Sequence, residues 1–426
     1  MKQVLVSFVI CCCLNFTIQA QETVVIGTVL NADQQPIEDA SVQLGQFFSS
    51  TDRRGQFKII ANYLPVQLLI NHPFYELYEQ IVLQQTGKDT IFLAITLITE
   101  STDLEEVTVN ADKIVWAYPE KSIHIIDFDL RDYGMLLLCS AEKQCFLRLV
   151  DDNNKTLFDQ PVRKNPLSFF HDCLDGIHLL YQDSVVELMV LYDTLFLLPP
   201  ASIGEFKQSL EPCALSKDKY VVFKQLGPHN KALDYTLVNR INQENRLLYQ
   251  AADTKQIKSL DAYAAENDIP AIAMLKANTS QQLSDDRKKW QNARHYEQNL
   301  IKPLYIPIVT VNDTTIIFDH FKDSMTVFSA DFSINRRSAI SYHYFDFWQN
   351  KLLVNEEHTR VFAKYEDRGL VKLREIDPHT GSVIGVVQLD KHVYPASIQI
   401  KGRFVYYLFH RYVDDSINYV YKQRID

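Results

Sequence analysis

A unit made of a polar turn and an apolar run recurs through most of this chain, and it constrains the fold more than any other feature. The turns lie roughly 40 to 50 residues apart, with one interval of about twice that length. Each unit has room for about four short strands, which is typical of a β-propeller blade. The sequence therefore predicts an all-β fold with a six-bladed β-propeller over residues 113–426. The six turns are Asp132-Tyr133-Gly134, Asp175-Gly176, Asp218-Lys219, Asn312-Asp313, Asn350-Lys351 and Lys401-Gly402.

The long interval between the third and fourth turns has a different composition. Residues 258–276 and 280–300 are rich in Ala, Gln, Glu, Lys and Arg, and their apolar residues recur at roughly helical spacing. This favours a helical insertion at about 254–301 over a seventh blade.

Four basic residues give this insertion a local positive charge in a chain whose formal net charge is −10. Such a reversal of charge can steer an anionic partner, either an acidic glycan or an acidic patch on an envelope protein. The alternative is that Leu283 and Trp290 hold the helices down as a plug and the charges are simply solvated. The four binding candidates are Arg287, Lys288, Lys289 and Arg294.

The two ends of the predicted propeller complement each other. Its last blade has strands only at 397–400, 404–409 and 418–423, whereas the strand at 114–118 belongs to no other blade. Pairing the two ends would leave no exposed sheet edge, which is how propellers avoid aggregation. We therefore expect residues 114–118 to complete the last blade.

Before the propeller, short apolar runs alternate with turn residues, the pattern of antiparallel strands joined by tight turns. We expect a seven-stranded β-sandwich over residues 21–98. Its strands are predicted at 24–30, 40–48, 56–61, 66–71, 77–84 and 90–95, with one further edge strand.

One turn of this region has a defined mechanism. Asp52 can accept hydrogen bonds from backbone N–H groups ahead of it, Gly55 can adopt the positive φ that ends the turn, and Phe57 returns to the core. Together with Gly27-Thr28-Val29 and Ala40-Ser41-Val42, this turn resembles the carboxypeptidase regulatory-like (transthyretin-like) domain of Bacteroidetes envelope proteins.

That domain also stands in front of many TonB-dependent receptors. Residues 104–111, inside a predicted linker at 99–112, resemble the segment that leads into the receptor plug. About 315 residues follow, too few for a plug and a barrel of about 22 strands. The resemblance therefore implies a docking module of the envelope, and the receptor function is not carried over.

The start of the chain indicates export. Residues 1–20 have the composition of a signal peptide, with an apolar run at 4–16. The cysteines at 11–13 suggest a lipoprotein, but Ile10 stands where a lipobox has a small residue. No later stretch is apolar enough for a transmembrane helix. We expect a periplasmic, outer-membrane-associated or cell-surface protein of a Gram-negative bacterium, and the acidic charge argues against a nucleic-acid partner.

Four cysteines remain after the predicted cleavage. Cys139 and Cys145 could face each other across a hairpin, and Cys173 and Cys213 lie in adjacent repeats. The alternative to one or two disulfides is four buried thiols.

Patterns for catalysis, metal binding or phosphate binding are not found, so no catalytic, metal-ligating or cofactor-binding residue is assigned and no cofactor is expected. The densest polar cluster is His171-Asp172-Cys173-Leu174-Asp175, at the start of the second blade. First strands line the channel of a propeller, so His171 and Asp172 are binding candidates there; the alternative is that they are buried polar groups with satisfied hydrogen bonds.

Two functions fit this sequence. The first is a non-catalytic binding or scaffold protein of the envelope, with the propeller as interaction platform and the sandwich as docking module. The second is a propeller enzyme that acts on glycans or peptides at the channel mouth. The missing catalytic constellation favours binding, and a channel in which several carboxylates or histidines converge would favour the enzyme.

Overall fold

The computed structural model divides the chain into two compact units, Met1–Val107 and Thr108–Asp426. The predicted signal peptide and the predicted linker at 99–112, except for Thr99, lie outside the residues that the structure describes. Within the described part of the chain, no helix is both long and apolar enough to cross a membrane. The described residues are 23–84, 89–99, 114–120, 122–142, 144–191, 194–267, 269, 287–389, 391–410 and 417–425.

The first unit contains two sheets over its described residues. Their strand orders are β4-β1-β7 and β3-β2-β5-β6. β1 pairs antiparallel with β4 and parallel with β7, and the pairs of the other sheet are antiparallel. The strands are β1 (Thr23–Leu30), β2 (Ser41–Leu44), β3 (Phe47–Ser50), β4 (Gln56–Ala61), β5 (Val66–His72), β6 (Tyr75–Val82) and β7 (Thr90–Thr96).

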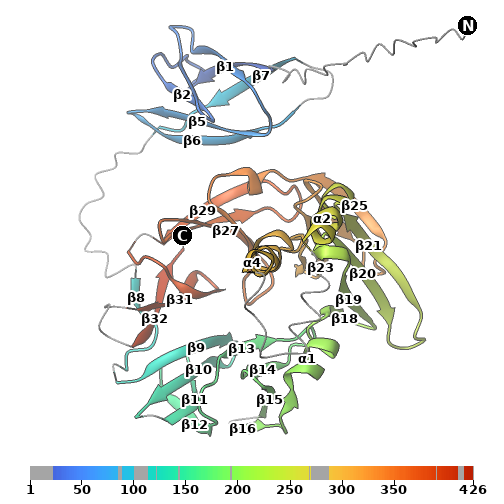
Figure 1. The fold of residues 1–426 in the computed structure, drawn as a ribbon. Helices are drawn as coiled ribbons and strands as arrows, with labels where there is room; N and C mark the ends of the chain where they lie inside the picture. The colour runs from blue at the N-terminus through green and yellow to red at the C-terminus, as the bar shows by residue number, and fades with distance from the viewer. Residues whose placement is uncertain are drawn as a thin grey trace, which may run out of the picture. The chain divides into compact units, whose positions relative to one another are not determined.

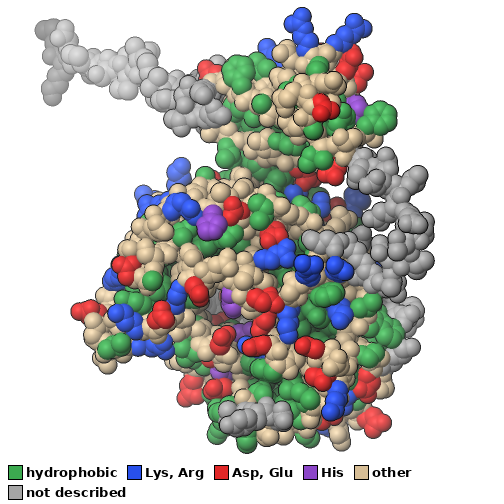
Figure 2. All heavy atoms as spheres, turned by 180° about the vertical axis from the view of Figure 1, so that it is seen from behind, with side chains coloured by type: hydrophobic (Ala, Val, Ile, Leu, Met, Phe, Trp, Pro, Cys, Tyr) green, Lys and Arg blue, Asp and Glu red, His purple; other side chains and the backbone are tan. Residues whose placement is uncertain are grey.

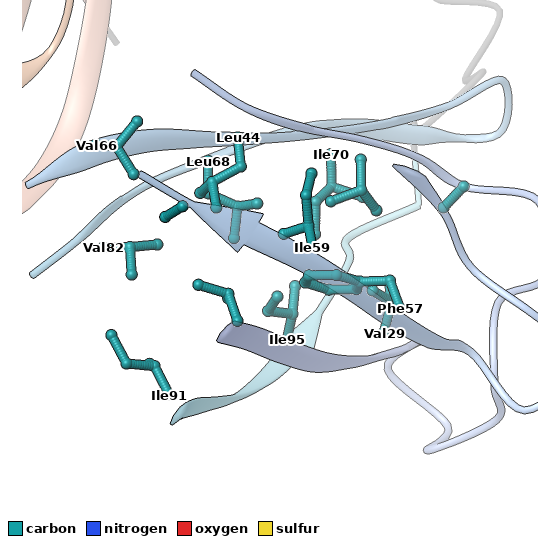
Figure 3. Close-up of a cluster of buried hydrophobic side chains, with 14 of the residues drawn as sticks. Val29, Leu44, Phe57, Ile59, Val66, Leu68, Ile70, Val82, Ile91 and Ile95 are labelled. Carbon is teal, nitrogen blue, oxygen red and sulfur yellow. The ribbon is translucent and has the colours of Figure 1, made fainter. Parts of the chain in front are cut away.

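One apolar core joins these two sheets. Alternate residues of β1 and β4 are buried, as expected for strands with one solvated face. Phe57 and Ile95 of one sheet and Leu68 and Ile70 of the other belong to the same cluster. Figure 3 shows these side chains pointing toward one another between the strands.

The segment predicted as a single strand at 40–48 is two strands, β2 and β3. Gly45 stands in the turn between them with a φ of +57°, a conformation that costs glycine little. The next turn is closed by the Asp52 carboxylate, which accepts the backbone N–H groups of Arg54 at 2.8 Å and Gln56 at 2.9 Å. Gly55 has a φ of +69°, and Phe57 is buried.

The second unit is propeller-like. Its described residues form six antiparallel sheets, each built around four strands, and Figure 1 shows them arranged in a ring. We name each sheet by its first strand. The strands are β9 (His124–Arg131), β10 (Gly134–Ala141), β11 (Gln144–Val150) and β12 (Thr156–Val162); β13 (Ser168–His171), β14 (Ile177–Leu180), β15 (Ser184–Leu191) and β16 (Thr194–Leu197), with β17 (Ala201–Ser202) added to β15; β18 (Cys213–Lys217), β19 (Tyr220–Leu226), β20 (Ala232–Asn239) and β21 (Asn245–Ala252); β22 (Ile308–Val311), β23 (Thr314–Asp319), β24 (Ser324–Phe328) and β25 (Ile334–Ala339); β26 (Trp348–Val354), β27 (Val361–Asp367), β28 (Leu370–Ile376) and β29 (Val383–Leu389); and β30 (Ala396–Lys401), β31 (Phe404–His410), β32 (Asn418–Arg424) and β8 (Ile114–Trp116).

The expected pairing of the two ends is confirmed. β8 pairs antiparallel with β32, with Trp116 opposite Tyr421 and Ile114 opposite Gln423. The sheet at the end of the chain is therefore completed by a strand from the start of the unit.

One of the six predicted turns is wrong. Asn350 and Lys351 lie inside β26, where the pairing with β27 shifts register between Trp348 and Leu352. Asn350 has a φ of +48°, so the polar pair marks an irregularity within a strand. The hairpin turn of this sheet follows Val354 instead.

Helices occupy part of the predicted insertion. They are α2 (Thr254–Glu266), α4 (Arg287–His295) and the π-helical turn η2 (Tyr296–Leu300). Leu260, Ala264, Ala293 and Tyr296 form a small core of their own. α2 ends ten residues before the predicted end at 276, and residues 270–286, which include Leu283, lie outside the described part. A separate short helix, α1 (Ile203–Ser209), begins at a capping box of Ser202 and Glu205 and leads into β18.

Candidate functional site

The first strands of neighbouring sheets lie against one another in the second unit. Gln399 of β30 donates a hydrogen bond to the carbonyl of Phe128 at 2.6 Å and accepts one from the N–H of Leu130 at 2.9 Å, both on β9. On the other side of β9, Asp127 accepts the backbone N–H of Phe169 of β13 at 2.9 Å. These bonds connect three sheets through their innermost strands.

A cavity of about 770 Å³ lies where the first hairpins of four sheets meet. Its wall is made by the β13–β14 turn, the end of β18, β22 with its turn, and the β26–β27 turn. We call this end of the sheets, where first and second strands join, the turn face. Figure 2 shows a hollow in the second unit with histidine, acidic and basic side chains around it.

Charged side chains of both signs line this cavity. Such a wall can donate hydrogen bonds to a polar ligand as well as accept them. The charged and titratable lining residues are Asp172, Asp175, Lys217, Arg240, Asp313, Glu357 and His358.

Two of these carboxylates are used inside the protein. Asp172 accepts the backbone N–H groups of Leu174 at 2.7 Å and Gly176 at 2.9 Å, and its other oxygen lies 2.7 Å from Nε2 of the buried His178. Glu357 accepts the side-chain amide of Asn355 at 2.6 Å and the N–H of Gly402 at 2.7 Å. Both residues therefore shape the turns around the cavity.

Other lining residues remain available to a ligand. Within the described part of the chain, the side chains of Asp175, Asp313 and His358 make no hydrogen bond, and all three residues are exposed. Lys217 donates to the backbone carbonyl of Asp313, and Arg240 donates to that of Asp218. Each cation keeps further N–H groups for a ligand.

His171, at the end of β13, is held by a buried carboxylate. Oδ1 of Asp129 lies 2.7 Å from Nε2 of His171, and its Oδ2 accepts a 2.6 Å bond from Nε of Arg131. Asp129 is 1% exposed, whereas the imidazole of His171 is 42% exposed. This contact places a buried carboxylate against a half-exposed imidazole.

Glu356 extends this cluster from the β26–β27 turn. Its backbone N–H donates to the carbonyl of Ile400 at 2.8 Å. Burial raises the pKa of the Glu356 carboxyl, while the positive charge of Arg131 opposes that rise; Asp129 and His171 also act on it electrostatically. A carboxylic acid that holds its proton to higher pH can donate a hydrogen bond near a half-exposed imidazole.

Of the residues expected here, the structure places His171 in this cluster and Asp172 on the cavity wall as a turn residue. Sequence reasoning missed Asp129, Arg131 and Glu356. Polar residues alternate with apolar ones in Asp127-Phe128-Asp129-Leu130-Arg131, and this period of two was a usable signal for one polar face of a strand.

A disulfide borders the cavity. Cys173, in the β13–β14 turn, is bonded to Cys213, at the start of β18, with Cα atoms 5.6 Å apart. It links two neighbouring sheets at the cavity wall.

Cys139 and Cys145 are both free thiols. The register pairs Cys139 with Phe146 and Cys145 with Ser140. Successive residues of a strand point to opposite faces, so the two cysteines project to opposite sides of the sheet and cannot be bridged.

The helical insertion contacts the β18 sheet at the end opposite the turn face. His229, between β19 and β20, contacts the hydroxyl of Tyr296 and lies 2.7 Å from Asp261 of α2. Since β19 starts at the turn face, the β19–β20 connection lies at its far end. The described part of the insertion is therefore not brought together with His171 and Asp172. Arg294 is exposed, and the side chains of Arg287, Lys288 and Lys289 lie outside the described part of the structure.

A metal centre is not indicated: in the ranges that the structure describes, no group of three or more His, Cys, Asp and Glu residues is placed to hold a metal ion.

Comparison with known proteins leaves the function open. No family model and no curated protein matches this chain. Among solved structures, it is similar to a DUF4221 family member from Bacteroides vulgatus, with 8% identity and a TM-score of 0.38 over 73% of this chain and 96% of that one. It is also similar to a luciferin-regenerating enzyme (8% identity, TM-score 0.32, 72% and 92% covered) and to regucalcin, a calcium-binding protein from Agrobacterium tumefaciens (8%, 0.31, 74% and 92%). At identities and TM-scores this low, no activity, ligand or site residue of these proteins is transferred to this chain.

Proposed function

We propose that this protein is a non-catalytic binding or scaffold protein of the cell envelope, with a six-bladed β-propeller as platform and a seven-stranded sandwich of the carboxypeptidase regulatory-like type as docking module. The propeller binds a polar ligand, a glycan or a peptide segment, in the cavity of the turn face. The observation that carries this proposal is the convergence of charged side chains from four sheets around one cavity.

The architecture supports the platform role. Consecutive four-stranded sheets whose ring is closed by β8 and β32 fit blades of a propeller, and a propeller binds ligands at its faces because its outer strands occupy the sides. The Cys173–Cys213 disulfide supports export, since disulfides persist in oxidising compartments.

Binding fits the cavity better than catalysis does. Carboxylates do converge there, which alone would favour an enzyme, but Asp172 and Glu357 are used in turn hydrogen bonds. Asp175, Asp313 and His358 are exposed and make no side-chain hydrogen bond to any described residue, which suits recognition of hydroxyl, amide or ammonium groups.

A cavity-filling variant tests the proposal. Ser216 lines the cavity, and Ser216→Trp should abolish binding to arrays of envelope glycans and peptides while leaving the unfolding transition in place. The matched control is Ile384→Trp, at a 61% exposed position on the outer strand β29. Loss of binding in the Ser216 variant alone supports ligand binding in the cavity. Equal array profiles for both variants and the native chain contradict it.

The second candidate function is a propeller enzyme acting on glycans or peptides at the turn face. The observation that favours it is the Asp129–His171 contact, in which a buried carboxylate orients a half-exposed imidazole. An imidazole beside a buried carboxylate suits a general base, and burial raises the pKa of the Glu356 carboxyl in the β26–β27 turn, which acts electrostatically with both residues.

Turnover separates the two functions. Incubation of the native chain with pooled glycans and peptides, followed by mass spectrometry, would show new products if the protein is an enzyme. His171→Ala should then abolish product formation but keep array binding. Binding without products by the native chain supports the first proposal.

A further inference from the structure

We infer that a pocket between β21 and the β24–β25 hairpin binds a small oxyanion: the carboxylate, sulfate or phosphate group of a ligand. The pocket has a volume of about 290 Å³ and lies between the β18 sheet and the β22 sheet. It shares no residue with the cavity of the turn face. Its lining residues are Leu247, Leu248, Tyr249, Gln250, Lys322, Ser324, Thr326 and Arg337.

The strand register brings the donors of this pocket to one face. Thr326 of β24 is directly opposite Arg337 of β25, so both side chains project to the same side of the sheet. Ser324 is two residues before Thr326 and shares that side. A guanidinium and two hydroxyl groups thus stand together, and all three can donate to an anion.

Two of these donors have no hydrogen-bond partner among the residues that the structure describes. Thr326 is only 2% exposed and lines the pocket, yet its hydroxyl makes no hydrogen bond within the described part of the chain. In the same part, the guanidinium of Arg337 makes neither a hydrogen bond nor an ion pair, although it acts electrostatically on Tyr249. A bound oxyanion would accept hydrogen bonds from both groups.

Lys322 adds a second positive charge. Its ammonium group donates to the carbonyl of Gln250 at 2.9 Å and lies 5.3 Å from the centre of the Tyr249 ring. These contacts leave further N–H donors on the same group.

Asp319, which forms an ion pair with Lys322, offsets only one of the two positive charges. Asp319 is 1% exposed, and its Oδ2, 3.9 Å from Nζ of Lys322, accepts a 2.7 Å bond from the hydroxyl of Tyr249. Its Oδ1 accepts the N–H groups of Phe321 and Lys322, both at 2.9 Å. Burial, and then the contact with Asp319, raises the pKa of Tyr249, so this hydroxyl keeps its proton. With one carboxylate internally bonded and two cations present, the pocket has an excess of positive charge.

The test uses the full chain with sodium sulfate, sodium phosphate and sodium glucuronate as probes, at ionic strength held constant with chloride. Binding is followed by calorimetry and by the shift of the melting temperature. We expect saturable binding to at least one probe, and the probe with the lowest Kd identifies the anion class. Arg337→Gln should weaken it about ten- to a hundredfold, because a hydrogen bond to a charged group is lost.

Arg336→Gln is the matched control. Arg336 is the preceding residue of β25, is also exposed, and projects to the opposite face of the sheet. Thr326→Val, which keeps the shape of the side chain and removes its hydroxyl, should also weaken binding. Equal effects of the two arginine variants, or the absence of saturable binding to all three probes, would overturn the inference.

Discussion

Trp116 of β8 lies directly opposite Tyr421 of β32, so the sheet at the end of the chain is completed from the start of its unit. The Trp116 ring also stacks on Tyr419 at a centroid distance of 5.8 Å and meets Tyr421 edge-on at 6.4 Å. Aromatic packing therefore secures the closing strand, whose three residues give it only a short ladder of backbone hydrogen bonds.

Removal of the Trp116 ring should weaken the pairing of β8 with β32. We expect Trp116→Ala to lower the free energy of unfolding of the second unit by about 2–4 kcal/mol, because a partly buried aromatic side chain and its ring contacts are lost. The measurement is urea denaturation followed by circular dichroism. Val115→Ala is the control, since Val115 is 38% exposed and points to the other side of the strand. Similar losses in both variants would show that the rings do not secure β8.

Gly55→Ala should destabilise the first unit by about 2–3 kcal/mol. Gly55 has a φ of +69°, and a Cβ there would lie 2.3 Å from the carbonyl oxygen of Val29. Gly402→Ala provides the comparison, because its φ is +56° and no atom lies within 4 Å of the added Cβ. That change should cost only about 1 kcal/mol in the second unit. If thermal unfolding shows that the two substitutions lower the free energy of unfolding by the same amount, the close approach to Val29 is unimportant.

Loss of the Cys173–Cys213 disulfide should destabilise the second unit by roughly 4 kcal/mol, the chain-entropy value for a sequence separation of 40 residues. The double variant Cys173→Ser/Cys213→Ser is compared with the native chain by urea denaturation, with and without reductant. Reductant should weaken the native chain and leave the variant unchanged. Cys145→Ser, which removes a free thiol, is the control and should keep the response to reductant.

The partly buried His320 should make stability depend on pH. Burial, and to a lesser extent the neighbouring His343, lowers the pKa of His320 from 6.5 to about 3. The neutral ring is held by the carbonyl of Tyr305, 3.0 Å from Nδ1, and by the hydroxyl of Tyr342, 2.8 Å from Nε2.

Because the folded-state pKa of His320 is depressed, the unfolded chain takes up the proton first as the pH falls. The contribution of His320 is therefore complete above pH 6.5 and is lost toward pH 3, by at most about 1.4 kcal/mol per pH unit. We expect His320→Gln to flatten the dependence of unfolding free energy on pH in that window. His379→Gln, at an exposed position, is the control and should leave the slope unchanged. If the His320→Gln variant keeps the same dependence of unfolding free energy on pH as the native chain, this account is contradicted.

The insertion can be tested as a recognition element separately from the cavity. Replacing residues 256–299 by a short linker should leave the six sheets folded, because the small core of the insertion is separate from theirs. If its basic residues steer an anionic partner, the shortened chain should lose crosslinking to partners that the full chain captures. Arg294→Glu, at an exposed position, should produce part of that loss. Unchanged capture by a folded shortened chain would leave the insertion as a plug with solvated charges.

Local rules account for the elements that the sequence predicted well. The period of two in β1 and β4, the turn around Asp52 and Gly55, and the recurring turns of the second unit depend on neighbouring residues. The same rules misled at Asn350-Lys351, because a polar pair with positive φ is used there inside β26. They also missed the break at Gly45, where a glycine within an apolar run was interpreted as continuous strand.

The sequence by itself determined an all-β chain, its strand periodicity, the helical character of its insertion and the strand that closes the last sheet. Only the tertiary structure decided which polar residues meet. Asp129 and His171 lie on different sheets and Glu356 lies in the β26–β27 turn of a third. Thr326 faces Arg337 because of the β24–β25 register. Periodicity tells which face a side chain takes, but its neighbours across sheets depend on register and ring closure, which are set by packing over the whole unit.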